Sequence, residues 1–457
     1  MKFLDRKAEL GEFKALEKLS KKKLFVIALY GLRRVGKTRL LLEYIKERGI
    51  YFFVNKNKTS QDLLAEYTEV LRKHGIITEL ETLGTWEKFV DVITSRSAPP
   101  LVFDEFQNFA AVEPTINGIF QKNIDLKENN PGMLIFSGSL IGLMKKLFMD
   151  SKEPLYGRIK KGVKLEPLQL SSCLELEKEL KLEREELVKI YCLFGGYPKY
   201  YVAIEDFSLQ GKTAWDVLGS LMLAKDAPLE DEVNSILSQE FGGRSGTYYS
   251  ILEAIANGNN TLSTIAACMS AQPTSITRQI NELRDYFEII DFEMPFQGKR
   301  GIYRIRHPLI NFWFSQIYKN FSDYAARKPE FVESLGKNLN AVYGKAFEAP
   351  AREFLANELG LAGAKRQWGK IAGAEKGKNT YEIDLIGKCK QGVFAFEFKW
   401  KELECAEAMG CLKELENKLK NVHNMPHDTR LGIVAKKLKE KRKLRALGYF
   451  AYDIEDF

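Results

Sequence analysis

The sequence predicts an α/β fold made of several modules, and three observations support this prediction. The chain has 457 residues, which exceeds one ordinary core, since about 150 residues per domain gives roughly three domains. In its first part, short apolar runs alternate with helical patterns, as in a parallel sheet covered by helices. In its last part, a helix precedes two strand patterns joined by a turn, which indicates a second α/β unit.

Composition narrows the class of protein. The hydrophobic share of 45% and the charged share of 28% are typical of a globular protein, and no run of about 18 apolar residues is available to span a bilayer. The charged opening MKFLDRKAEL lacks the apolar stretch of a signal peptide, so we expect a cytoplasmic protein without a membrane partner. The six cysteines form no C-x-x-C pair, which argues against a zinc site or a disulfide framework. The net charge of +8 suits a polyanion partner, but so small an excess decides nothing alone.

The first apolar run leads into a loop that predicts nucleotide binding. Leu24–Tyr30 reads as a buried strand, and Gly31–Thr38, GLRRVGKT, matches G-x-x-x-x-G-K-[ST]. Its glycines let the backbone curl, so that amide groups point at phosphate oxygens. We expect Lys37 to reach the β- and γ-phosphates of ATP and Thr38 to offer its hydroxyl to Mg²⁺, at the positive end of the following helix. The residues expected to bind ATP here are Gly31, Leu32, Arg33, Arg34, Val35, Gly36, Lys37, Thr38 and Arg39.

Two further strands are predicted at Ile50–Asn55 and Leu101–Phe106. The second of them carries Asp104 and Glu105 near its end, where a P-loop enzyme places its second acidic motif. We expect Asp104 to hold the Mg²⁺ shell and Glu105 to take a proton from the attacking water. An isolated Asp-Glu pair is more often a turn or a cap, so this interpretation depends on the upstream loop.

A fourth strand, Met133–Ser139, ends in small hydroxyl residues. Ser137 or Ser139 is a candidate contact for the γ-phosphate or the attacking water, although Ser-Gly-Ser also commonly begins a helix. Arg158 follows a glycine and precedes a strand pattern, and an arginine near the γ-phosphate can sense hydrolysis. We therefore include Ser139 and Arg158 among the expected ATP contacts, while a single arginine is usually a surface residue.

These features together resemble the archaeal-type ATPase family in the STAND class of AAA+-like P-loop ATPases. The matching stretches are FLDRKAEL, GLRRVGKT, LVFDEF, FSGSLIGLM, LYGR and FGGYPKY. The resemblance implies an ATPase core over residues 1–170 and a helical lid over 171–240, with Gly195, Gly196 and Pro198 beside the nucleotide, although such residues also form plain turns. It further implies a switch, in which ATP holds the lid and the later modules in one arrangement and hydrolysis releases them.

Residues 241–335 predict a winged helix-turn-helix. Helical patterns at Tyr248–Ala256, Leu262–Met269 and Ser275–Phe287 precede the strand-like stretches EIIDFE and IYRIRH, which a basic turn joins. In this fold the third helix can enter a DNA major groove while the wing touches phosphate. Winged helices also dock proteins, so both kinds of partner stay open. The candidate DNA contacts are Thr277, Arg278, Asn281, Arg284, Lys299 and Arg300.

Residues 336–457 hold a second group of polar side chains. TYEIDLIGK reads as a strand with Asp384 on its polar face, and VFAFEFKWKE reads as a strand on which Glu397 and Lys399 share a face, since strand side chains alternate. The preceding helix carries Glu348. The lysine-rich stretch 435–448 reads as a solvated helix or as a patch that follows phosphate groups, with the solvated helix as the default interpretation.

This order of helix, Asp strand and Glu-x-Lys strand resembles the PD-(D/E)XK nuclease superfamily, although Ile383 stands in place of the proline. The resemblance implies that Asp384 and Glu397 bind Mg²⁺, that Lys399 orients or activates a water, and that Glu348 assists. Two carboxylates that fix a metal and a lysine beside the nucleophile are sensible chemistry for phosphodiester cleavage. The same residues are also compatible with the solvated faces of two amphipathic strands.

The complete prediction is an α/β fold: a P-loop ATPase core with a parallel sheet, a helical lid, a winged helix-turn-helix and a C-terminal α/β restriction-endonuclease-like domain. We expect an ATP-binding and hydrolysing protein, with ATP and Mg²⁺ as cofactors, that controls a DNA-binding, nuclease-like domain. The predicted catalytic residues are Lys37, Glu105, Asp384, Glu397 and Lys399. The alternative is a non-cutting switch that regulates a protein partner or binds DNA without cleavage, and a homo-oligomer or a regulatory protein partner is compatible with it.

Overall fold

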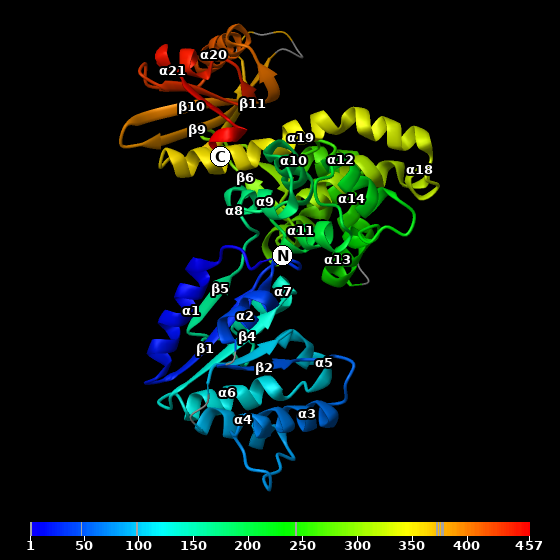
Figure 1. Cartoon of the computed structure of the whole chain (residues 1–457), viewed down its shortest axis with the longest axis vertical. Helices are drawn as coiled ribbons and strands as arrows, with labels where there is room; N and C mark the ends of the chain where they lie inside the picture. The colour runs from blue at the N-terminus through cyan, green and yellow to red at the C-terminus, as the bar shows by residue number, and fades with distance from the viewer. Residues whose placement is uncertain are drawn as a thin grey trace.

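The computed structural model describes residues 2–46, 48–96, 99–242, 245–371, 373, 375 and 379–457, and for residue 245 the backbone alone. The first sheet lies at one end of an elongated molecule, a group of helices lies in the middle, and a second sheet lies at the other end (Figure 1). Among the described residues, no helix combines the length and the apolar character needed to cross a membrane.

The first sheet has five parallel strands in the order β2-β3-β4-β1-β5. Helices cover both of its faces, which explains why its strands read as continuous apolar runs. Because all strands are parallel, their carboxyl ends meet at one edge. The strands are β1 (Leu24–Tyr30), β2 (Ile50–Phe53), β3 (Leu101–Asp104), β4 (Gly132–Gly138) and β5 (Lys161–Lys164). The helices are α1 (Lys7–Ser20) and α2 (Lys37–Ile45) on one face, and α3 (Ser60–Lys73), α4 (Trp86–Ser95), α5 (Phe109–Val112), α6 (Ile116–Leu126) and α7 (Ile141–Met149) toward the other.

The middle of the molecule consists of helices and one hairpin that share a single apolar core. The first helices are α8 (Leu170–Leu174), α9 (Glu177–Leu180), α10 (Arg184–Phe194), α11 (Pro198–Asp206), α12 (Ala214–Leu218) and α13 (Glu232–Phe241). Then come α14 (Ser245–Ala256), α15 (Leu262–Cys268), α16 (Pro273–Asn281) with the π-helical turn η3 (Glu282–Tyr286), the antiparallel hairpin of β6 (Ile290–Glu293) and β7 (Ile302–Ile305), α17 (Pro308–Phe312) and α18 (Phe321–Ala325).

The second sheet has the order β12-β11-β10-β9-β8. β8, β9 and β10 are antiparallel neighbours, whereas β10, β11 and β12 run parallel, so helices supply the parallel crossovers. One long helix packs on one face and a second helix on the other. The elements are α19 (Pro329–Glu358), β8 (Ala362–Lys370), β9 (Thr380–Cys389), β10 (Gly392–Leu403), α20 (Cys405–Leu419), β11 (Arg430–Leu438), α21 (Lys441–Ala446) and β12 (Phe450–Asp453).

The lysine-rich stretch 435–448 differs from the sequence expectation. Its first part belongs to strand β11, and only Lys441–Ala446 is helical. Ile433, Val434 and Ala435 are fully buried, so burial of this apolar segment in the sheet outweighs the helical preference of the lysines that follow. The prediction of one solvated helix was therefore wrong.

Candidate functional site

The loop between β1 and α2 forms a tight cradle in which two glycines are required. A side chain at Gly31 would place its Cβ 2.4 Å from the carbonyl oxygen of Leu165. Gly36 has a φ of +96°, a left-handed conformation that glycine adopts without steric cost. The motif therefore has its glycines where the backbone needs them.

Lys37 lies over this cradle. Its Nζ donates hydrogen bonds to the carbonyl oxygens of Gly31 and Leu32, at 2.8 and 3.0 Å. Burial lowers the pKa of Lys37 to about 8, against the opposing effect of Glu105 and Asp104. The ammonium group is thus held at the mouth of the loop, where an anion would meet it.

Asp104 at the end of β3 is buried and accepts three hydrogen bonds. Thr38 Oγ1 donates to its Oδ2 at 2.6 Å, Tyr51 OH donates to the same oxygen at 2.8 Å, and the Glu105 amide donates to Oδ1 at 3.1 Å. A hydroxyl and a carboxylate side by side are the hard oxygen donors that Mg²⁺ prefers. The chemistry of these donors fits the predicted metal.

Glu105 is positioned from two sides. Its backbone has a φ of 56°, an uncommon conformation for a residue with a side chain that turns the chain sharply after β3. Ser139 Oγ, which follows β4, donates to Glu105 Oε2 at 2.8 Å, and Gln107 Nε2 donates to the same oxygen. Of the two candidate serines, Ser139 is therefore the one that meets Glu105, and Ser137 Oγ is buried without a hydrogen-bond partner among the described residues.

The remaining loop residues differ in burial and in the partners of their side chains. Val35 is fully buried, and Leu32 contributes the carbonyl that Lys37 contacts. Arg34 pairs with Glu232 of α13 at 3.1 Å. Arg33 has a buried Nε without a hydrogen-bond partner among the described residues, and Arg39 is exposed on the first turn of α2.

Arg158 is not brought to the phosphate loop. It donates to both carboxylate oxygens of Asp125 in α6, at 3.0 and 2.8 Å. The neighbouring Lys160 amide donates to the carbonyl of Val26, near the start of β1, so Arg158 lies toward the edge of the sheet opposite the loop. We leave Arg158 out of the proposed site.

The segment around Gly195, Gly196 and Pro198, which we predicted to lie beside the nucleotide, does contact the loop. A Cβ at Gly196 would lie 1.7 Å from the carbonyl oxygen of Leu168, so only glycine fits there. Pro198 Cγ lies 3.6 Å from where a Cβ at Gly36 would be. Helix α11 therefore begins directly against the phosphate loop, with Gly195 in a left-handed turn before it.

Three residues at this site were missed from the sequence. Tyr51 and Gln107 hold Asp104 and Glu105. Glu240 of α13 faces the same group: burial raises its pKa to about 8, against the opposing effect of Arg33 and Lys37. Nothing in the local pattern marks these residues, because they come from a strand interior, a short turn and a distant helix.

The second candidate site lies on the β9–β10 hairpin. The register that pairs Phe396 with Leu385 places Asp384 across from Glu397. The Phe398 amide donates to Asp384 Oδ2 at 2.6 Å. Burial and the nearby Glu397 raise the pKa of Asp384. Two carboxylates are thus brought together on this hairpin.

Glu397 is buried, and its two carboxylate oxygens differ in their hydrogen bonds. Its Oε1 accepts hydrogen bonds from Lys399 Nζ at 2.8 Å and from Lys418 Nζ of α20 at 3.0 Å. Its Oε2 is buried without a hydrogen-bond partner among the described residues. Lys418 was missed from the sequence, since only the crossover helix brings it here.

Glu348 and the arginines around it form the rim of this site. Arg366 Nε lies 3.6 Å from Glu348 Oε2, and Arg366 also pairs with Glu382. Arg352 Nε donates to the carbonyl of Asp384 at 3.3 Å. Burial raises the pKa of Glu348. Within the described parts of the chain, no group of three or more His, Cys, Asp or Glu side chains is placed to hold a metal ion.

The candidate DNA contacts lie on two elements. On α16 and η3, Arg278 pairs with Glu282 at 2.9 Å and Arg284 with Asp285 at 2.6 Å. Asn281 is exposed, and the Thr277 hydroxyl donates to the carbonyl of Pro273. In the hairpin loop, Lys299 and Arg300 are exposed, and the carbonyl of Arg300 accepts a hydrogen bond from Trp368 of β8.

Comparisons with known proteins match two parts of the chain to described families and the whole chain to one relative. A family described as an ATPase domain predominantly from Archaea matches residues 3–204, and a family described as "Archaea bacterial proteins of unknown function" matches residues 313–411. The chain is 31% identical over 469 residues to the uncharacterized protein MJECL04 of Methanocaldococcus jannaschii, with 100% of both chains covered.

A solved structure supports the fold. The Walker-type ATPase PABY2304 of Pyrococcus abyssi superposes with a TM-score of 0.53 at 21% identity, over 68% of this chain and 96% of that chain. The ORC2 protein of Aeropyrum pernix gives 0.46 at 14% identity, over 69% and 94%. The predicted P-loop ATPase core with its parallel sheet is confirmed. The chain therefore belongs to the same family as MJECL04, and its first part is an archaeal-type ATPase domain.

Proposed function

We propose that this protein hydrolyses ATP at the phosphate loop and uses its nucleotide state to control a metal-dependent, DNA-cleaving site in the C-terminal unit. The ATPase domain is the starting point. Our proposal adds a winged-helix role for α14 to β7 and a nuclease-like role for α19 to β12. The module boundaries near residues 170, 240 and 335 belong to the same proposal.

At the phosphate loop, we assign each side chain the role that its contacts favour. Lys37 binds the β- and γ-phosphates, and Thr38 and Asp104 hold Mg²⁺, which supplies positive charge for phosphoryl transfer when bound. Glu105 accepts the proton of the attacking water. Ser139 keeps the Glu105 carboxylate in place through its 2.8 Å hydrogen bond.

One observation carries the proposal for the C-terminal unit: Glu397 Oε2 is a buried oxygen without a hydrogen-bond partner among the described residues, on the strand beside Asp384. An unpaired buried carboxylate oxygen is costly and is usually satisfied by a partner. A divalent cation between Asp384 and Glu397 would supply that partner. The order of α19, β8, β9, β10, α20 and β11 agrees with the nuclease-like interpretation.

The roles at this second site follow from position. Asp384 and Glu397 would hold the metal, which polarises a phosphate oxygen and lowers the pKa of water when bound. Lys399, whose Nζ lies 2.8 Å from Glu397 Oε1, would orient the attacking water. Glu348 would assist from α19. The exposed side chains of α16 and the hairpin loop are proposed to hold DNA.

The experiment measures cleavage of double- and single-stranded DNA with Mg²⁺ or Mn²⁺, with and without ATP. Asp384→Asn and Lys399→Met should each lower cleavage by about 100-fold or more. Lys418→Met is the matched control, because Lys418 contacts the same Glu397 oxygen as Lys399. It should retain cleavage within about tenfold, and equal losses in the two lysine variants would indicate a structural role for both.

A second function, a STAND-type switch that binds DNA or a protein partner without cutting, has an observation of its own in its favour. Two lysines neutralise Glu397, and a carboxylate balanced in this way is stable without a metal. Absence of cleavage under every condition, with ATP turnover intact, would select this alternative.

A further inference from the structure

Glu288, just before β6, anchors the hairpin to the ATPase domain. Its Oε1 lies 2.5 Å from Lys145 Nζ of α7, and its Oε2 lies 2.5 Å from Lys164 Nζ of β5. Arg306, just after β7, adds a contact of 3.2 Å to Glu288 and another to Glu166. Burial alone would raise the pKa of Glu288, but the hydrogen bonds from the two lysines hold it below its usual value.

The helix at this anchor follows the strand that reaches the nucleotide site. α7 begins two residues after Ser139, which contacts Glu105. The ring of Tyr286 packs so closely on α7 that a Cβ at Gly142 would lie 2.1 Å from it. Lys145 Nζ also donates to the carbonyl of Asp285 at 2.8 Å. A shift of α7 would therefore displace the residues at the start of the hairpin, which contact it directly.

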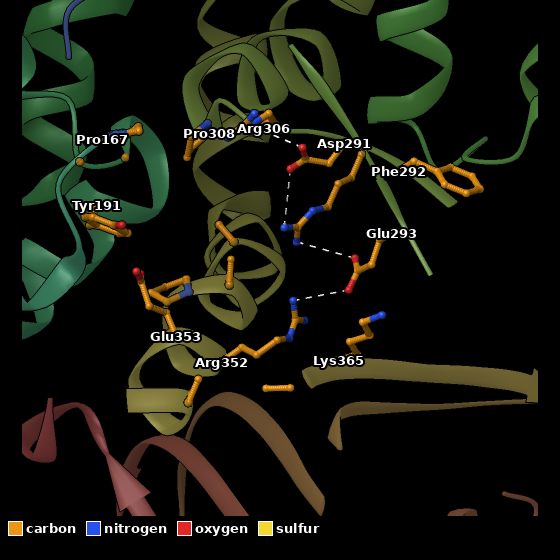
Figure 2. Close-up of a pocket in the computed structure, with 18 of the residues that line it drawn as sticks. Pro167, Tyr191, Asp291, Phe292, Glu293, Arg306, Pro308, Arg352, Glu353 and Lys365 are labelled. Carbon is orange, nitrogen blue, oxygen red and sulfur yellow. Dashed lines mark ion pairs between the residues drawn. The ribbon is translucent and has the colours of Figure 1, made fainter. Parts of the chain in front are cut away.

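Glu293, the last residue of β6, anchors the other end of the strand to the C-terminal unit. Its Oε1 lies 3.6 Å from an amino group of Arg352 in α19, and its Oε2 lies 3.8 Å from one of Arg366 in β8. Figure 2 shows Glu293 and Arg352 pointing toward each other, and both residues line a pocket of about 720 Å³ between the modules. The exposed fraction of the Glu293 side chain is 13%, so water screens these pairs only partly.

The loop after β6 strengthens this second anchor. The Phe296 amide donates to the carbonyl of Arg366 at 2.8 Å, and the Gln297 amide donates to Gln367 Oε1 at 2.7 Å. The loop thus attaches to the free edge of β8. Arg352 and Arg366 are the same arginines that contact Asp384 and Glu348. A single side chain therefore separates Glu293 from each of these two residues of the candidate nuclease site.

We propose that β6 is a two-ended link that transmits the nucleotide state from α7 to the Asp384 site. β6 is a strand of only four residues that is paired with β7 over its whole length, so a displacement at Glu288 would be carried along it to Glu293. When α7 shifts, Glu293 moves Arg352 and Arg366 relative to Asp384 and Glu348. The consequence for cleavage rests on the proposed function, whereas the link itself is testable without cleavage.

The test is hydrogen exchange of β8 and β9 with and without a non-hydrolysable ATP analogue. In the wild type, the analogue should change exchange rates in these strands by about fivefold or more. Glu288→Gln and Glu293→Gln should each reduce this response to less than about twofold while binding the analogue normally. Lys145→Met is a second variant at the first anchor, in case Glu288→Gln does not fold.

Glu382→Gln is the matched control, because Glu382 pairs with the same Arg366 from strand β9 and is not one of the two glutamates that anchor β6. It should keep the full response. A full response in both anchor variants, or none in a wild type that binds the analogue, would overturn the link. A response that needs both anchors in a protein that never cuts DNA would support the link and reject only the cleavage proposal.

Discussion

The phosphate-loop site and the C-terminal carboxylate site use the same kinds of side chain, but they are assembled differently. The acidic and hydroxyl groups of the first, Thr38, Asp104, Glu105 and Ser139, all lie at one edge of a single parallel sheet. The second has its two carboxylates on one hairpin, while the contacts around them come from α19, α20 and, through Arg352 and Arg366, from β6 of another module. The acidic and hydroxyl groups of the first site are therefore fixed by their own sheet, whereas the carboxylates of the second site depend on contacts from neighbouring elements.

The largest effect should come from removing the cation of the first site. Lys37→Ala should lower ATP turnover by about 100-fold or more, because the charge that meets the phosphates is lost. Steady-state ATP hydrolysis measures this, and circular dichroism checks that the fold is kept. Normal turnover in the folded variant would remove the basis for assigning Lys37 to catalysis.

A smaller effect on ATP turnover should distinguish Ser139 from Arg158, which the sequence both predicted to contact ATP. Ser139→Ala should lower turnover by about tenfold with little change in ATP affinity, because it loosens Glu105 without touching the loop. Arg158→Ala is its control and should leave turnover within about twofold, since Arg158 pairs with Asp125 away from the loop. Equal losses of turnover in the two variants would mean that a position at the carboxyl ends of the strands does not decide which residues act in turnover.

The smallest effect should appear in stability and not in ATP turnover. Glu397→Gln removes the buried carboxylate that Lys399 and Lys418 share, which should lower the free energy of unfolding by about 1–2 kcal/mol, after allowing for the partial exposure of both lysines. Denaturant unfolding measures this, and turnover should stay within about twofold.

Glu414→Gln is the control for this measurement. Glu414 also contacts Lys418, but its side chain is 66% exposed, and exposed pairs contribute little. A loss of stability as large as that of Glu397→Gln would show that the buried position of Glu397 is not what matters.

The contrast between the two sites also explains what the sequence could predict. The loop, Asp104 and Glu105 were predictable because glycine spacing and strand ends determine where they lie. The Asp384–Glu397 pair was predictable because strand side chains alternate. Lys418, Arg366 and Glu240 were not predictable, because their positions depend on how helices and modules pack in space. The position of Arg158 was not predictable for the same reason. Nearness along the sequence does not tell at which end of the parallel strands a residue lies.

The attachment of the hairpin loop to β8 has a consequence for dividing the chain. A fragment that began at residue 336 would contain the whole second sheet, yet it would lack Phe296 and Gln297, which satisfy part of the outer edge of β8. Phe296 also covers apolar side chains of that sheet. An uncovered edge strand invites pairing between copies and aggregation. A soluble C-terminal fragment should therefore begin before β6 and carry the hairpin with it.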